Sequence, residues 1–202
     1  MEKMLKAASY AAEAHKFQTR KSDGSAYICH PLRVAHFLAE CAVQDPVVLI
    51  AAVLHDVVED TSATNEDIRA EFGDEVADVV AEVSDDRSLS AAERKRAQLE
   101  HIEAKSKRAR QVKAADMYDN LSSLIEQSPP GWSAERTRGY FVWKYLIWKR
   151  GIRGRTGTLL DVKLGGLFES CIPDGNGKIV PVIPQGIDLD SRLERYLESL
   201  AA

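Results

Sequence analysis

The sequence predicts an all-α fold, a helical bundle of about eight to ten helices with a small C-terminal extension that includes a β-hairpin. Three observations predict it. Apolar residues recur at intervals of three and four along most of the chain, which places them on one face of a helix. Two prolines stand where a helix should begin, a position at which the missing N–H group has no partner to lose. A hairpin signal first appears after residue 168.

Three helices are predicted in the first 58 residues, separated by polar segments rich in turn-forming residues. They are expected to run from the N-terminus to about Phe17, from His30-Pro31 onward, and from Asp45-Pro46 to about Val58. Residues 47–54 are apolar on every side of the third helix. This helix should therefore be a central, buried element.

Five further helices are predicted between residues 65 and 150, and the last of them carries an aromatic core face. Their expected spans are residues 65–73 with Asn65 as the cap, a helix that starts at Asp74, residues 91–107, residues 109–126 and residues 133–150.

The pattern changes after Phe168. A turn signal over residues 173–177 precedes a short strand over residues 178–183, and an amphipathic helix over residues 191–200 ends the chain. We therefore predict a helical domain over residues 1–168 and a C-terminal extension over residues 169–202. The sequence leaves two roles open for the extension: it covers the domain, or it mediates self-association as a homo-oligomer.

Composition excludes several classes of function. A formal net charge of −4 and a pI near 5.8 leave no global basic field that would hold nucleic acid by its phosphates. The longest apolar run, residues 47–54, is too short to cross a bilayer, and the N-terminus is not an apolar signal segment. Three widely spaced cysteines fit a reducing cytosol. We expect a soluble, cytoplasmic protein that binds neither nucleic acid nor membrane.

The strongest chemical signal is the placement of His55, Asp56, Glu59 and Asp60 at the end of the apolar third helix. Residues three and four apart share a helix face, so the carboxylates should converge. Buried carboxylates this close repel one another, and a divalent cation removes that cost. The adjacent histidine and aspartate supply two ligands that suit a first-row metal. The alternative is that the acids point outward at the helix end.

Further metal ligands have to come from other helices, and two residues are candidates. His30 stands at a helix start, where its side chain is free to turn inward. Asp116 lies in an apolar stretch, four residues before Asn120 on the same helix face. Taken alone, His30 would more often be a cap or core residue, and Asp116 a salt-bridge partner of Lys113.

Three motifs carry a resemblance to a known family. They are Tyr27-Ile28-Cys29-His30-Pro31, His55-Asp56-Val57-Val58-Glu59-Asp60-Thr61, and Lys113-Ala114-Ala115-Asp116 with Asn120. Together they resemble the hydrolase domain of the RelA/SpoT stringent-response enzymes, and most closely their stand-alone small alarmone hydrolases of the metazoan SpoT-homologue type. The likeness extends over residues 2–168.

The resemblance implies a helical HD-domain enzyme that binds one Mn²⁺ ion and removes the 3′-pyrophosphate from ppGpp or pppGpp. The implied metal ligands are His30, His55, Asp56 and Asp116. The residues implied to activate or orient the attacking water are Glu59 and Asp60. The implied substrate contacts are Arg20 and Lys21 for the polyphosphate, Tyr27 and Asn120 for the nucleoside, and Arg136 with Tyr140 for the far phosphate side.

Two residues depart from the family pattern. Met117 stands where a basic residue is usual, and Asp119 stands where Tyr or His is common and adds a negative charge. Two other functions stay open: a phosphatase for another 2′- or 3′-phosphorylated nucleotide such as NADPH, and a non-catalytic nucleotide-sensing domain. Glu59 and Asp60 are both present, which argues against a degenerate sensor.

Overall fold

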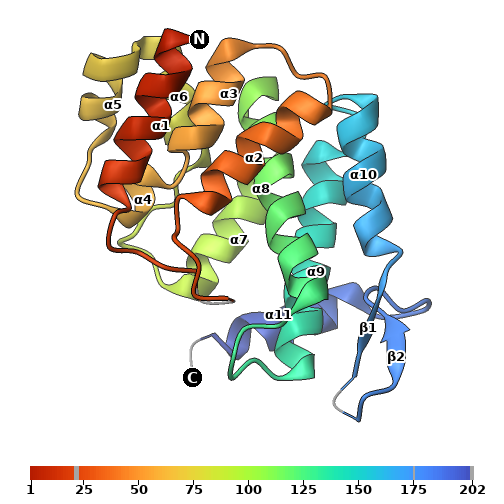
Figure 1. The fold of residues 1–202 in the computed structure, drawn as a ribbon. Helices are drawn as coiled ribbons and strands as arrows, with labels where there is room; N and C mark the ends of the chain where they lie inside the picture. Colours follow the sequence, from red (N-terminus) through yellow and green to blue (C-terminus); the bar gives the residue numbers. More distant parts are fainter. Residues whose placement is uncertain (21–22, 175, 201–202) are drawn as a thin grey trace.

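The computed structural model describes residues 1–20, 23–174 and 176–200, and it confirms the predicted all-α class (Figure 1). Helix α4 follows α3 after a two-residue break, so the described α-helices number ten when this pair is taken as one. The elements are α1 (Glu2–Ala14), α2 (Cys29–Glu40), α3 (Pro46–Leu54), α4 (Val57–Asp60), α5 (Asn65–Phe72), α6 (Asp74–Val83), α7 (Ala91–His101), α8 (Lys107–Glu126), α9 (Ala134–Ile147), the π-helix η1 (Trp148–Ile152), α10 (Thr158–Phe168), β1 (Cys171–Pro173), β2 (Ile179–Pro181) and α11 (Leu189–Glu198).

Helices α3 and α8 form the centre of the bundle. Helix α3 packs against α1, α2, α6 and α8, and α8 also contacts α2, α6 and α10. In Figure 1, α8 (green) lies between α3 and α10. Six of the nine residues of α3 are buried, which confirms that the most apolar helix is central. Buried apolar surface is the main stabilising contribution to a fold, so the residues that follow α3 are held by a rigid element.

The predicted third helix is interrupted where the sequence indicates a metal site. The prediction continues the helix to about Val58, but α3 ends at Leu54 and α4 begins at Val57. The ring of His55 donates a hydrogen bond from Nδ1 to the Ala52 carbonyl at 2.8 Å, so a side chain takes a backbone acceptor of the last turn. Asp60 N donates to Asp56 O at 2.8 Å, a helical hydrogen bond that holds Asp60 one turn after Asp56.

Several predicted helix ends differ from the structure. Thr64, not Asn65, caps α5, because its side chain accepts from Asp67 N while Asp67 accepts from the Thr64 backbone. Helix α1 ends at Ala14 rather than near Phe17, and α7 ends at His101 rather than near residue 107, where Ser106 already caps the next helix. The prediction also omits α10 altogether. Four glycines between residues 154 and 166 disfavour helix there, and packing against α8 overrides that preference.

The C-terminal segment, residues 169–202, contributes a hairpin and a helix at one end of the bundle (Figure 1). Strands β1 and β2 pair antiparallel with Cys171 opposite Pro181, as the turn signal indicates. Helix α11 packs against α9. The approach is close at Gly139, where a Cβ atom would lie 2.6 Å from the Cβ of Tyr196.

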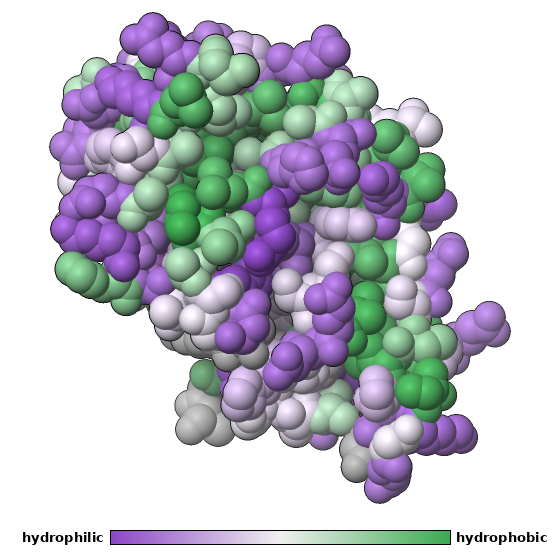
Figure 2. All heavy atoms as spheres, in the orientation of Figure 1, coloured by the Kyte–Doolittle hydropathy of each residue, from purple (hydrophilic) through white to green (hydrophobic). Residues whose placement is uncertain are grey.

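Hydrophilic and hydrophobic residues are unevenly distributed over the surface. On the face shown in Figure 2, hydrophilic residues (purple) form a band through the middle, between more apolar areas (green) on either side. Within the described part of the chain, none of the helices combines the length and the apolar character that a bilayer span requires.

Candidate functional site

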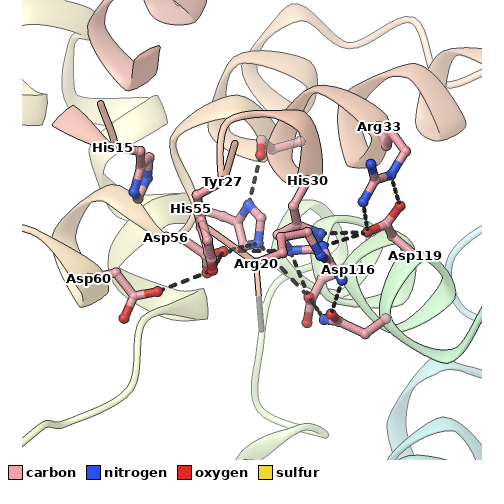
Figure 3. A network of polar contacts seen from close by, with 12 residues as sticks. His15, Arg20, Tyr27, His30, Arg33, His55, Asp56, Asp60, Asp116 and Asp119 are labelled. Atoms are coloured by element: carbon pink, nitrogen blue, oxygen red, sulfur yellow. Dashed lines mark hydrogen bonds and ion pairs between the residues drawn. The ribbon is translucent and has the colours of Figure 1, made fainter. Parts of the chain in front are cut away.

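Four side chains from three parts of the chain meet at the break between α3 and α4 (Figure 3). His55 and Asp56 form the break, His30 lies in the first turn of α2, and Asp116 lies on α8. His55 Nε2 is 3.2 Å from Asp56 Oδ2 and 3.9 Å from Asp116 Oδ1. His30 Nε2 is 3.5 Å from each of the same two oxygens. The structure therefore brings together the four residues predicted as metal ligands.

Both imidazole rings are anchored through Nδ1. In His55 this nitrogen is bonded to the Ala52 carbonyl, and in His30 it lies 2.7 Å from Asp119 Oδ2. Nε2 of each ring is left facing the two carboxylates. In the described residues, the buried His55 Nε2 has no hydrogen-bond partner. A histidine held through one nitrogen with the other directed at carboxylates is the arrangement of a metal ligand, so these residues fit a divalent cation.

The candidate ligand atoms lie close together, and charged neighbours lower the pKa of both carboxyl groups. His30, His55 and Asp56 each offer a ligand atom, and these atoms lie within 4.8 Å of one another. Burial alone would raise the pKa of Asp116, but Lys144 and Lys113, 3.7 and 3.6 Å away, hold it well below its usual range. Burial also opposes the charge of Asp56, and the neighbouring His55 lowers the pKa of that carboxyl. Metal binding requires deprotonated carboxylates, so both residues are prepared for it.

Two further carboxylates, Glu59 and Asp60, stand on α4 beside the cluster. Burial and the adjacent Asp85 raise the pKa of Glu59, whose Oε2 accepts a hydrogen bond from Asp85 N at 3.1 Å. Burial and Asp56 raise the pKa of Asp60. The Tyr27 hydroxyl donates to Asp56 Oδ2 at 2.7 Å and lies 3.1 Å from Asp60 Oδ2. A carboxylate whose pKa is raised is a better proton acceptor near neutral pH.

A cavity of about 670 Å³ opens onto these groups. Its volume falls within the range of roughly 300–1,000 Å³ that holds cofactor-sized ligands. Arg20, Arg87 and Lys113 bring positive charge to its lining, and Trp132 and Tyr140 bring aromatic rings. The cavity thus combines a cationic region for phosphate groups with an apolar wall for a planar base.

The predicted substrate residues do not all reach this cavity. Arg20, Tyr27, Asn120 and Tyr140 line it. Tyr27 does so with its hydroxyl already bonded to Asp56, one of the predicted metal ligands. Arg136 lines a second cavity instead, with its guanidinium carbon 4.7 Å from the centre of the Trp132 ring. Lys21 lies outside the described residues.

Sequence reasoning missed the network around Asp119. This residue was expected only to add negative charge, yet Arg33 donates to both of its oxygens at 2.6 and 3.1 Å and Arg20 donates at 3.0 Å. The charge of Asp119 is therefore balanced, and the residue holds His30. A signal was present: Arg33 and Asp119 each stand three residues after a predicted ligand, His30 and Asp116, and so share its helix face.

Comparison with known proteins gives consistent matches. The HD domain family model matches residues 7–146. The guanosine-3′,5′-bis(diphosphate) 3′-pyrophosphohydrolase MESH1 of Xenopus tropicalis is 46% identical over 167 residues, covering 82% of this chain and 92% of that protein. The human MESH1 is 43% identical over 168 residues, covering 82% of this chain and 93% of that protein. A solved structure described as a metazoan orthologue of SpoT that hydrolyses ppGpp superposes with a TM-score of 0.80 at 42% identity, covering 83% of this chain and 94% of that one.

Proposed function

Because the chain belongs to the HD-domain family, with MESH1 pyrophosphohydrolases among its relatives, we propose that it removes the 3′-pyrophosphate from ppGpp and pppGpp. The products are GDP or GTP and pyrophosphate. One observation carries the proposal: the histidine–carboxylate cluster opens into a cavity that also presents cations and aromatic rings. A nucleotide polyphosphate needs all three features in one place.

We propose Mn²⁺ as the metal, one ion per site. His30, His55, Asp56 and Asp116 would hold it, because imidazole nitrogens and carboxylate oxygens both suit this ion. When bound, the ion supplies Lewis-acid polarisation of a phosphoryl oxygen. Asp119 keeps the His30 ring turned toward the site, and the Ala52 carbonyl does the same for His55.

The remaining chemistry belongs to the side chains. A water oxygen attacks the phosphorus next to the ribose 3′ oxygen, a new P–O bond forms, and the bond from phosphorus to the 3′ oxygen breaks. Glu59, with its raised pKa, accepts a proton from the water, and the leaving 3′ oxygen takes up a proton. Asp60, fixed beside Tyr27, orients the water. Pyrophosphate and the nucleoside 5′-diphosphate or 5′-triphosphate are released.

The proposed substrate contacts follow from the cavity lining. Arg20 is held by Asp119 at 3.0 Å and by Asn120 at 3.3 Å, so its guanidinium is positioned before a phosphate arrives. Lys21, its neighbour in the chain, is proposed as a second phosphate contact. Asn120 and Tyr140 line the wall available to the nucleoside and its far phosphates. Arg136 stays a prediction.

The test is a hydrolysis panel on the purified full chain. ppGpp, pppGpp, NADPH and GTP are each incubated with protein that has been stripped of metal and reloaded with Mn²⁺, Mg²⁺ or no metal, and pyrophosphate is separated from orthophosphate. We expect Mn²⁺-dependent pyrophosphate release from ppGpp and pppGpp, and none from the Asp56→Ala variant. Orthophosphate from NADPH alone would instead identify a nucleotide phosphatase, and binding of ppGpp without turnover would identify a sensor.

A further inference from the structure

A second cavity, of about 530 Å³, lies between the first turns of α9 and the last helix, α11. Arg136 lines it from α9, and Arg192 and Arg195 line it from α11. Half of this cavity therefore comes from the C-terminal segment, which lies beyond the residues matched by the HD family model. Apart from Arg136, which the family resemblance predicts as a substrate contact, no residue that lines it has a proposed role in hydrolysis.

The arginines of this cavity have no acidic partners. In the described part of the chain, no carboxylate lies within 4.0 Å of the guanidinium nitrogens of Arg136, Arg192 or Arg195. Glu135 and Glu198 also line the cavity, and three arginines against two glutamates leave the lining a net charge of +1. Arg136 and Arg192 are half-buried, and basic groups drawn out of water are ordinarily paired. Three unpaired guanidinium groups around one hollow therefore favour an anion.

Arg195 donates a hydrogen bond to Ser191 Oγ at 3.2 Å, but two of the three arginines have buried donors that are unused. Nε of Arg136 and Nε of Arg192 are buried and have no hydrogen-bond partner among the described residues. A buried donor without a partner is costly, and a ligand oxygen would satisfy it. The 14-residue helix α9 begins at the same cavity, with Ser133 as its cap, and a helix start favours negative charge.

The second cavity is separate from the catalytic one but adjoins its wall. Among the described residues, none lines both cavities. The Arg136 guanidinium stacks on Trp132, and the Tyr196 ring centre is 6.5 Å from that of Tyr140; Trp132 and Tyr140 both line the catalytic cavity. A ligand between α9 and α11 would therefore press on side chains that face the substrate.

We propose that the α9–α11 cavity is a second anion site, which binds a small polyphosphate group and modulates the neighbouring catalytic cavity. Two sources offer that chemistry: free pyrophosphate, and the 5′-diphosphate end of a guanine nucleotide. The binding part of this proposal does not depend on the proposed hydrolase activity, because it concerns arginines outside the metal site.

The experiment titrates inorganic pyrophosphate and, separately, GDP into the full metal-loaded chain by calorimetry. The test variant is Arg192→Ala/Arg195→Ala, and the matched control is Arg153→Ala, an exposed arginine outside both cavities. We expect two pyrophosphate sites per wild-type chain, with one weakened about tenfold or more in the test variant, since several charge-assisted hydrogen bonds are lost. The conservative double variant, Arg192→Lys/Arg195→Lys, should retain part of the affinity, which separates charge from loss of folding.

The titrations with pyrophosphate and GDP distinguish the two possible ligands. If pyrophosphate binds at the second site and GDP does not, the ligand is the free anion; the reverse identifies the nucleotide. In steady-state ppGpp hydrolysis, occupation of the site should add a non-competitive component to inhibition by pyrophosphate that the double alanine variant lacks. Identical stoichiometry and affinity for both pyrophosphate and GDP in wild type, test variant and control would overturn the anion site, whether or not the chain hydrolyses ppGpp.

Discussion

The two cavities of this protein use arginine and lysine in opposite ways. Beside the metal ligands, the cations are already paired: Arg20 and Arg33 with Asp119, and Lys113 and Lys144 with Asp116. Between α9 and α11, the arginines have no such partners in the described residues. Pairing fixes side chains in place before the substrate arrives, as catalysis requires. Unpaired guanidinium groups remain free to pair with an anionic ligand.

The largest expected effect comes from removing a metal ligand. His55→Ala or Asp56→Ala should abolish metal binding and ppGpp hydrolysis together, because each takes away a donor and leaves the opposing charges uncompensated. Metal content and pyrophosphate release are measured on the same preparations. His36→Ala, an exposed histidine on α2, is the control and should behave as wild type. Near-normal turnover in either ligand variant would show that the metal assignment is wrong.

Glu59→Gln should separate chemistry from metal binding. The amide keeps the size of the side chain but cannot take a proton, so we expect metal affinity to stay and hydrolysis to slow by about 10²-fold or more. The rate at saturating ppGpp is compared with calorimetric binding of Mn²⁺. Glu66→Gln, on the exposed face of α5, serves as the control. A variant that turns over at the wild-type rate would remove Glu59 from the mechanism.

Local sequence patterns mark the cluster beside α3, whereas they do not mark the cavity between α9 and α11. The proposed metal ligands His55, Asp56 and His30 stand at helix ends marked by an apolar run and by proline, and those local signals indicate the site. Helical spacing then explains why Asp60 stays near Asp56 even though the helix breaks between α3 and α4. The family resemblance added the roles of these residues, which spacing does not contain.

Sequence patterns do not predict contacts between segments that are far apart in the chain. Arg33 and Asp119 are 86 positions apart and meet only because α2 crosses α8. The α9–α11 cavity depends on Gly139, which lets Tyr196 approach to a distance that no other residue would permit. Helix α10 was missed because its glycines disfavour helix locally while its packing on α8 favours it. These features arise from how helices dock, not from the pattern within any one of them.

Asp119→Ala should weaken the metal site without removing a ligand. His30 would lose the carboxylate that orients its ring, and Arg20 and Arg33 would lose their shared partner. Loss of such an outer contact typically costs about 10- to 100-fold in metal affinity. Asp119→Asn keeps an acceptor for His30 and should recover part of that loss. Calorimetric titration with Mn²⁺ checks both; equal affinity in wild type and Asp119→Ala would mean that His30 needs no orienting partner.

The smallest effect tests whether the two cavities are separable. A methyl group at Gly139 would meet the Cβ and ring of Tyr196 at 2.6–2.7 Å, so α11 has to shift. Alanine favours a helix by about 1 kcal/mol over glycine, whereas overpacking costs about 1–3 kcal/mol, so we expect Gly139→Ala to lower the free energy of unfolding by about 1 kcal/mol in urea titrations.

The control for this change is Gly166→Ala in α10, where a Cβ atom would meet nothing within 4 Å. With no overpacking to oppose the helix preference, that variant should be stabilised by up to about 1 kcal/mol.

Pyrophosphate affinity at the second site should fall a few-fold in Gly139→Ala alone, because the arginines of α11 are displaced. Mn²⁺ affinity should stay unchanged in both variants, because the proposed metal ligands lie on α2, the α3–α4 break and α8. A lower free energy of unfolding in Gly139→Ala and a higher one in Gly166→Ala would show that the close approach of Tyr196 to Gly139 outweighs helix propensity. A loss of Mn²⁺ affinity in Gly139→Ala would show that the two cavities are not separable.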